Sequence, residues 1–143
     1  GLVGSEMCIR DRYNGYTNNI HENNKNDTDI LAYLKLRIIC AALNEGWEPQ
    51  FTEDEWRYYP WFWLYTQDEI DNMNEDEKKN RCLMSTGDYQ KSYAGLASAA
   101  SNSAPSHSAA GIGSRLCLKS DTLAVYCGKQ FINIWADFCL IRK

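Results

Sequence analysis

Histidine, the side chain best suited to acid–base and metal chemistry near neutral pH, occurs only at His21 and His107. Both lie in polar stretches, and neither belongs to a His-x-x-x-His pair, whose spacing would place two metal ligands on one helix face. The six cysteines contain no Cys-x-x-Cys pair. We therefore predict a non-enzymatic protein with no catalytic residue, no metal ligand and no cofactor.

Two further stretches have the charge or the glycines of known motifs, but not their pattern. A calcium loop that began at Asp71 would place Met73 and Glu75 at its third and fifth positions, and it would lack the required glycine. Gly111-Ile-Gly113 has no third glycine and precedes a predicted strand, whereas a dinucleotide loop follows one. We interpret these stretches as a solvated acidic helix and a loop.

The segment Tyr58–Tyr65 is the densest aromatic run in the chain, with the sequence Tyr-Tyr-Pro-Trp-Phe-Trp-Leu-Tyr. Pro60 excludes a helix and predicts an edge strand, or a strand that begins after it. Alternate residues of a strand share a face, so one face would carry Trp61, Trp63 and Tyr65 and the other Phe62 and Leu64. The favoured interpretation is that these rings fill the core, and the alternative is that they stack on bases or sugars.

The alternative function is that of a single-stranded nucleic-acid-binding accessory protein. Its candidate contact residues are Arg57, Trp61, Trp63, Arg115 and Lys119. A net charge of −4 and a pI of about 5.1 weigh against an anionic partner. We favour a binding or structural module with a protein partner; no membrane partner is predicted, and the sequence does not predict the oligomeric state.

The length of 143 residues suits one domain. Capping and helix-end signals predict three helices in its N-terminal half. Asp27 or Thr28 can cap an amphipathic helix that Gly46 ends. Thr66 opens a capping box, and Asn74 can cap a second short acidic helix. Cys40, Cys127 and Cys139 stand in apolar segments, and we expect reduced, mostly buried thiols and a reducing compartment.

The C-terminal third predicts a strand followed directly by a helix. Two leucines alternate with the other residues along Arg115–Lys119. Leu116 and Leu118 would point inward, and Cys117 would lie on a solvated face with the two basic residues. We expect it to be an inner strand that pairs with Tyr93–Ala99 across a flexible Ser/Ala-rich loop at about 101–112. A helix over Asp121–Leu140 would then turn Phe131, Ile134 and Phe138 inward, with Gly128 closely approaching another backbone. The predicted fold class is α+β, in which a small antiparallel sheet of about three strands is packed by an N-terminal and a C-terminal helix.

We expect the packed domain to span residues 28–143. Residues 1–12 resemble a translated sequencing-library adaptor, and residues 13–27, which are rich in Asn, read as a disordered lead-in.

Four blocks of the chain resemble a group of small proteins from gut Bacteroidales and their phages. The blocks are Ala41–Trp47, Tyr58–Phe62, Gly113–Ser120 and Leu123–Phe131, and they keep the order found in that group. The chain departs from the group's pattern at Leu118, usually Phe, and at Cys127, usually Ala. The group has no established activity, so the resemblance carries over no site residue. It implies a phage or mobile-element source and a location in the bacterial cytoplasm or the virion.

Overall fold

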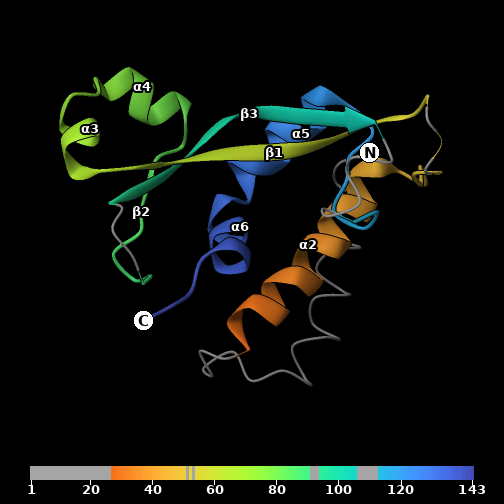
Figure 1. Cartoon of the computed structure of the whole chain (residues 1–143), viewed down its shortest axis with the longest axis horizontal. Helices are drawn as coiled ribbons and strands as arrows, with labels where there is room; N and C mark the ends of the chain where they lie inside the picture. The colour runs from red at the N-terminus through yellow and green to blue at the C-terminus, as the bar shows by residue number, and fades with distance from the viewer. Residues whose placement is uncertain (1–26, 51, 53, 91–93, 106–112) are drawn as a thin grey trace.

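The computed structural model describes residues 27–50, 52, 54–90, 94–105 and 113–143. These residues form an α+β fold in which a three-stranded antiparallel sheet is flanked by helices, as predicted (Figure 1). The strand order is β1-β3-β2, with β1 at Trp56–Tyr65, β3 at Gly95–Pro105 and β2 at Met84–Ser85. The two histidines, the adaptor-like residues 1–12 and nearly all of the lead-in lie outside the described residues.

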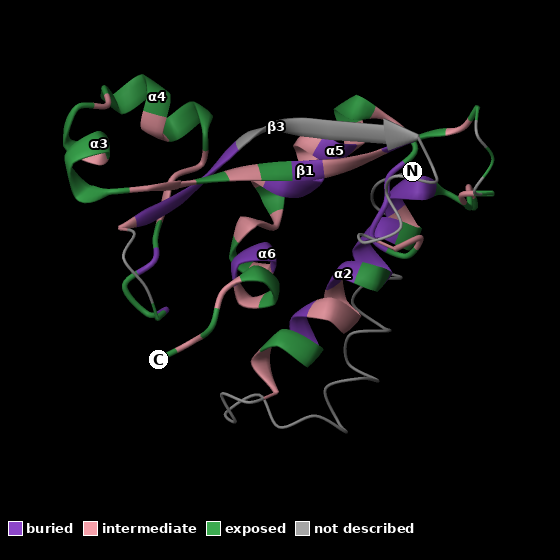
Figure 2. Cartoon of the chain, viewed as in Figure 1, coloured by how far each residue is buried: buried purple, intermediate pink, exposed green. Residues whose placement is uncertain are grey.

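Helix α2 spans Thr28–Asn44 and confirms the predicted N-terminal helix. Glu45 and Gly46 follow it with positive φ angles of 48° and 90°, so the chain leaves the helix in the left-handed conformation that glycine favours. One side of α2 is buried (Figure 2). Asn44, at its end, donates a side-chain hydrogen bond to the carbonyl of Cys117 at 2.9 Å and accepts one from the backbone N–H of Lys119 at 3.0 Å. The end of α2 therefore holds the chain just before α5.

Strand β1 is an edge strand of the sheet, as Pro60 predicts, and Pro60 lies within it. It pairs with β3 over its whole length, from Trp56 opposite Pro105 to Tyr65 opposite Gly95. The register shifts at Trp61 and Phe62, so that β3 carries one extra residue there.

The predicted strand pairing at the C-terminal side is wrong. Residues 101–105, predicted to belong to a flexible loop, continue β3 and pair with β1. The stretch 115–119 forms no named strand and makes one bridge, in which Tyr58 and Leu118 exchange backbone hydrogen bonds of 3.0 and 2.7 Å. The ten residues of β1 give β3 a longer antiparallel ladder than 115–119 could. Leu116 and Leu118 are buried, as predicted.

Two short helices follow β1, and both begin at the predicted caps. Thr66 and Glu69 form a complete capping box for α3 (Gln67–Asp71), and the Asn74 side chain accepts a hydrogen bond from the Glu77 N–H at the start of α4 (Glu75–Asn80). Neither helix contains a buried residue. They extend from one end of the sheet with an exposed surface (Figure 2).

The predicted single C-terminal helix is divided into α5 (Asp121–Gln130) and α6 (Ile132–Cys139). The break is at Phe131, whose φ of −119° and ψ of 30° depart from helical values. Helix α5 packs on β1 and β3, whereas α6 packs mainly on α2, and one straight helix would not follow both surfaces. Phe131 and Ile134 are half-buried against the core, but Phe138, predicted inward, is 37% exposed.

The main core lies between the sheet, α2 and the two C-terminal helices. Its buried residues are Leu36, Ile39, Cys40, Leu43, Leu116, Leu118, Ala124, Cys127 and Trp135. Gly128 of α5 lies against β1: a Cβ there would stand 2.9 Å from the Cβ of Pro60. The predicted close approach at Gly128 is therefore present, although it is to a proline ring and not to backbone. No helix in the described part of the chain is long and apolar enough to cross a bilayer.

Candidate functional site: an aromatic strip on the outer face of β1

Four aromatic residues alternate along β1 on the face opposite the core. They are Tyr59, Trp61, Trp63 and Tyr65, and we call them the aromatic strip. Trp61 is 47% exposed and Trp63 is 50% exposed. Their rings stack with centroids 5.5 Å apart and planes inclined by 23°. The predicted division of this run between two faces is correct, but the favoured interpretation that all its rings fill the core is wrong for these two tryptophans.

The neighbouring strand leaves the strip uncovered because its facing residues are small. In the antiparallel register, Trp61 is opposite Ala100, Trp63 is opposite Ala97 and Tyr65 is opposite Gly95. Directly opposed residues of an antiparallel pair point to the same face, so Trp63 and Tyr65 stand beside Ala97 and Gly95, which carry little or no side chain. Ala97 is fully buried.

The Tyr65 end of the strip is bounded by the excursion that contains α3 and α4. A Cβ built at Gly95 would stand 2.8 Å from Ile70 Cδ1 and 2.9 Å from Leu83 Cδ1, so these side chains lie over the outer face there. Arg81 Nη1 donates a hydrogen bond to the Tyr65 hydroxyl. No sequence signal indicates that Arg81, sixteen residues beyond Tyr65, belongs to this surface.

The opposite end of the strip does not expose Arg57, which we predicted as a contact residue. Alternation places Arg57 on the outer face, yet it is completely buried. Burial raises the pKa of the Cys117 thiol, and the nearby Arg57 guanidinium partly offsets this rise. Cys117 itself is fully buried, contrary to the predicted solvated face. An Arg57 side chain buried in this way cannot contact a ligand on the outer face.

Arg115 and Lys119 are exposed, as a contact role requires, but they are not part of the strip. The bridge between Tyr58 and Leu118 uses the edge of β1 that faces away from β3. It sets Lys119 opposite Arg57, about 13 Å along the strand from Trp61, at a rise of about 3.3 Å per residue. The structure thus brings together Trp61 and Trp63 from the predicted set, buries Arg57, and leaves Lys119 beyond one end of the strip and Arg115 exposed in the preceding turn.

Three of the five described cysteines, Cys40, Cys117 and Cys127, are buried, and they show no features of a reactive site. Cys40 and Cys127 are buried as predicted, whereas Cys139 is exposed, and all five described cysteines are free thiols. A hydrogen bond with Cys127, together with burial, raises the pKa of Cys40. A nucleophilic cysteine needs a lowered pKa. The described residues contain no cluster of His, Cys, Asp or Glu that could hold a metal ion.

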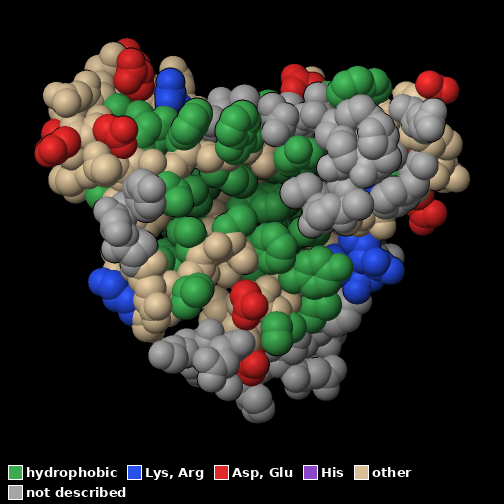
Figure 3. Space-filling model, in the orientation of Figure 1, with side chains coloured by type: hydrophobic (Ala, Val, Ile, Leu, Met, Phe, Trp, Pro, Cys, Tyr) green, Lys and Arg blue, Asp and Glu red, His purple; other side chains and the backbone are tan. Residues whose placement is uncertain are grey.

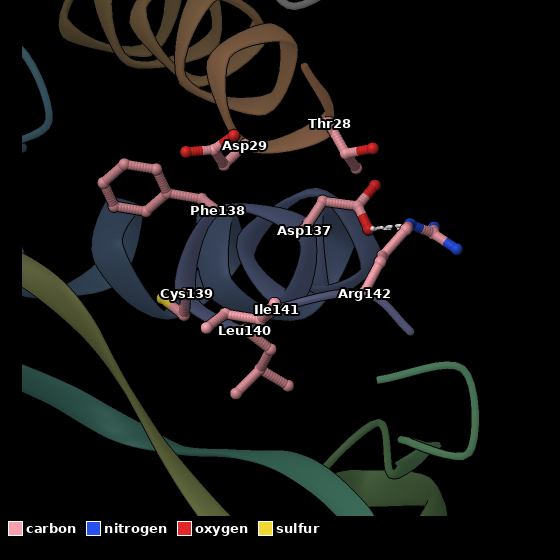
Figure 4. Close-up of a pocket in the computed structure, with 8 residues that line it drawn as sticks. All are labelled: Thr28, Asp29, Asp137, Phe138, Cys139, Leu140, Ile141 and Arg142. Atoms are coloured by element: carbon pink, nitrogen blue, oxygen red, sulfur yellow. Dashed lines mark hydrogen bonds and ion pairs between the residues drawn. The ribbon is translucent and has the colours of Figure 1, made fainter. Parts of the chain in front are cut away.

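A second polar group joins the C-terminal residues to the loop before β3. The Tyr89 hydroxyl donates to Asp137 Oδ1 at 2.5 Å, and Arg142 donates to the same oxygen from Nε at 3.1 Å and Nη2 at 2.9 Å. Beside it is an open cavity of about 250 Å³ between the start of α2 and the end of α6 (Figure 4). This volume is below the range of typical ligand pockets. We interpret the group as a structural clamp that fixes the C-terminal residues.

Comparison of the chain with protein-family models, with curated proteins and with solved structures finds no match.

Proposed function

We propose that the protein is a non-enzymatic binding module and that the aromatic strip is its contact surface for a protein partner. The observation that carries this proposal is the exposure of Trp61 and Trp63 on a sheet face that the C-terminal helices leave open. Tryptophan and tyrosine are enriched in the energetic centres of protein interfaces because they bury a large area with few rotatable bonds. Two adjacent half-exposed indoles form the kind of apolar patch that marks an interaction site.

A second candidate function is the binding of single-stranded nucleic acid, and the same exposure favours it. Stacked indoles can receive bases whatever the sequence. The cationic groups that would hold the phosphates are few, since Arg57 is buried and Lys119 lies beyond the Tyr59 end of the strip. We therefore rank a protein partner first. By resemblance to the Bacteroidales and phage group, we propose that this partner belongs to a bacterial host or to the virion.

Selection from a random peptide library displayed on phage tests the proposed contact surface. Peptides selected on the wild-type protein should lose binding to the Trp61→Ala/Trp63→Ala variant. They should retain binding to Trp56→Ala, because Trp56 is 52% exposed on the same strand but points to the other face. Selected peptides that bind all three proteins equally would refute the strip as the contact surface.

A further inference from the structure

We infer that the ligand of the aromatic strip is an extended peptide segment that carries arginine or lysine side chains. This inference rests on the proposed function and adds the chemistry of the partner. The strip from Tyr59 to Tyr65 covers about 20 Å at the rise of a β-strand, which matches an extended segment of about six residues. Aromatic side chains alone do not distinguish a basic segment from an apolar one, so the charges around the strip decide.

The charged rim at the Tyr65 end of the strip is acidic. Residues 66–81 contain six acidic and three basic residues, a net charge of −3, and all six carboxylates are exposed. Figure 3 shows these acidic side chains gathered where α3 and α4 extend from the sheet. Ile70 anchors this segment over the outer face, so its carboxylates lie at the end of the strip and not on a remote surface.

Half of these carboxylates are available to a ligand. Glu69 completes the capping box, Asp71 accepts a hydrogen bond from Gln67, and Glu75 pairs with Lys78 at 3.3 Å. Within the described residues, the structure gives no side-chain hydrogen bond or ion pair to the remaining three, Asp68, Asp76 and Glu77. A cationic side chain can pair with them without displacing an internal interaction.

The indoles and these carboxylates both attract positive charge. The face of a tryptophan ring attracts an ammonium or guanidinium group, and tryptophan does so more strongly than tyrosine or phenylalanine. The overall charge of −4 steers cationic ligands toward the protein. Arg81, the basic residue that reaches the strip, directs one guanidinium nitrogen at the Tyr65 hydroxyl. Ring faces, rim and net charge therefore favour a basic peptide over nucleic acid.

Binding measurements with one synthetic peptide test this inference. The peptide is an extended segment of about eight residues in which arginine alternates with serine, labelled for fluorescence anisotropy. We expect it to bind, and we expect its affinity to fall as salt is raised, because salt screens exposed charges. The matched peptide with glutamate in place of arginine and a short oligothymidylate should not bind.

Variants of the protein separate the rings from the rim. Trp61→Ala/Trp63→Ala should weaken binding of the arginine peptide by roughly tenfold or more, as loss of two cation–π contacts implies. Trp56→Ala should leave the affinity unchanged. Asp68→Asn/Asp76→Asn/Glu77→Gln should weaken binding and flatten its salt dependence. Trp63→Lys, which keeps a long side chain and adds a repelling charge, replaces the double variant if the latter does not fold.

Each contrary result has a distinct meaning. Uncharged library peptides that bind through Trp61 and Trp63, with no binding of the arginine peptide, would overturn this inference and leave the proposed function standing. Arginine-peptide binding that ignores both tryptophans would overturn the inference and the contact surface together, since it would reflect diffuse attraction to acidic residues. Tryptophan-dependent binding of oligothymidylate would overturn both in favour of nucleic acid.

Discussion

Phe62 and Trp63 are neighbours in β1, yet they have opposite environments. Phe62 contacts Trp135 with ring centroids 5.9 Å apart and joins both core clusters, whereas Trp63 is half-exposed and stacks on Trp61. The two faces of this strand have similar apolar content but different neighbours. Helices cover the inner face, while the outer face has a row of small residues on β3 and an acidic segment at its end. The comparison teaches that aromatic content does not by itself identify a core strand.

The largest effect should come from removing a ring of the inner face. Phe62→Ala should lower the free energy of unfolding by about 3 kcal/mol, near the lower limit for buried phenylalanine because Phe62 is only partly buried. Urea denaturation followed by circular dichroism gives this value. A loss below about 1 kcal/mol would mean that the helices do not pack on this face as described.

Gly128 tests how closely α5 approaches the same inner face. Gly128→Ala gains about 1 kcal/mol of helix propensity, but its Cβ would stand 2.9 Å from the rigid ring of Pro60. We expect a net destabilisation of about 1–2 kcal/mol because overpacking outweighs propensity. Gly87→Ala, whose Cβ would meet only Ser85 Oγ at 3.5 Å, is the matched control and should be nearly neutral. A stabilised Gly128→Ala variant would refute the close approach.

Tyr89, which packs with Leu96 beneath the inner face, gives this region a pH dependence. Burial, followed by its hydrogen bond to Asp137, raises the pKa of Tyr89. The folded state therefore holds the phenolic proton more tightly than the unfolded state, whose tyrosine pKa is about 10. Below about pH 10 the contribution is complete, and it is lost as the pH rises toward the folded pKa.

Denaturation at several alkaline pH values measures this loss. The raised pKa values of Cys40 and Cys117 act in the same direction, so the wild type should be compared with Tyr89→Phe. The difference in stability between the two proteins should shrink above about pH 10. A difference that stays constant across this range would show that Tyr89 ionises equally in both states.

The smallest effect on stability should come from the outer face. Trp61→Ala and Trp63→Ala should each change the free energy of unfolding by about 0.5 kcal/mol or less, because they remove exposed surface. The two substitutions together should reduce the tryptophan fluorescence that iodide quenches, and Trp56, which is 52% exposed, should account for most of the rest. Destabilisation as large as that of Phe62→Ala would mean that the two faces do not differ, and that the rings belong to a core.

Local sequence signals predict the helices and strands well, but they predict poorly which strands pair when these are far apart in the sequence. The caps at Thr66 and Asn74, the end of α2 near Gly46 and the alternation along β1 follow from neighbouring residues, and the structure confirms all of them. The predicted partner of β3 is wrong because residues 115–119 and β1 both show apolar alternation. Only the length of the ladder with β1 shows which of these two segments pairs with β3. No proline or glycine stands at the break at Phe131, so no local signal predicts it.

Only part of the candidate site can be predicted from the sequence, for the same reason. Trp61 and Trp63 follow from the period of a strand, but whether their face is covered depends on β3, whose small residues gave only a weak strand signal. Arg57 is buried near Cys117, which lies sixty residues later, and the contact of Arg81 with Tyr65 depends on how the chain returns to the sheet after α4. Sequence spacing carries none of this information.

The indole resonances in a ¹⁵N NMR spectrum report directly which tryptophans contact a basic peptide. The chain has five tryptophans, and the side-chain N–H of each gives one signal. On addition of the arginine–serine peptide, we predict that the signals of Trp61 and Trp63 move. The signals of Trp56, exposed on the other face, and of Trp135, buried in the core, should stay in place. Equal movement of the Trp56 and Trp63 signals, or no movement of Trp61 and Trp63, would contradict the account.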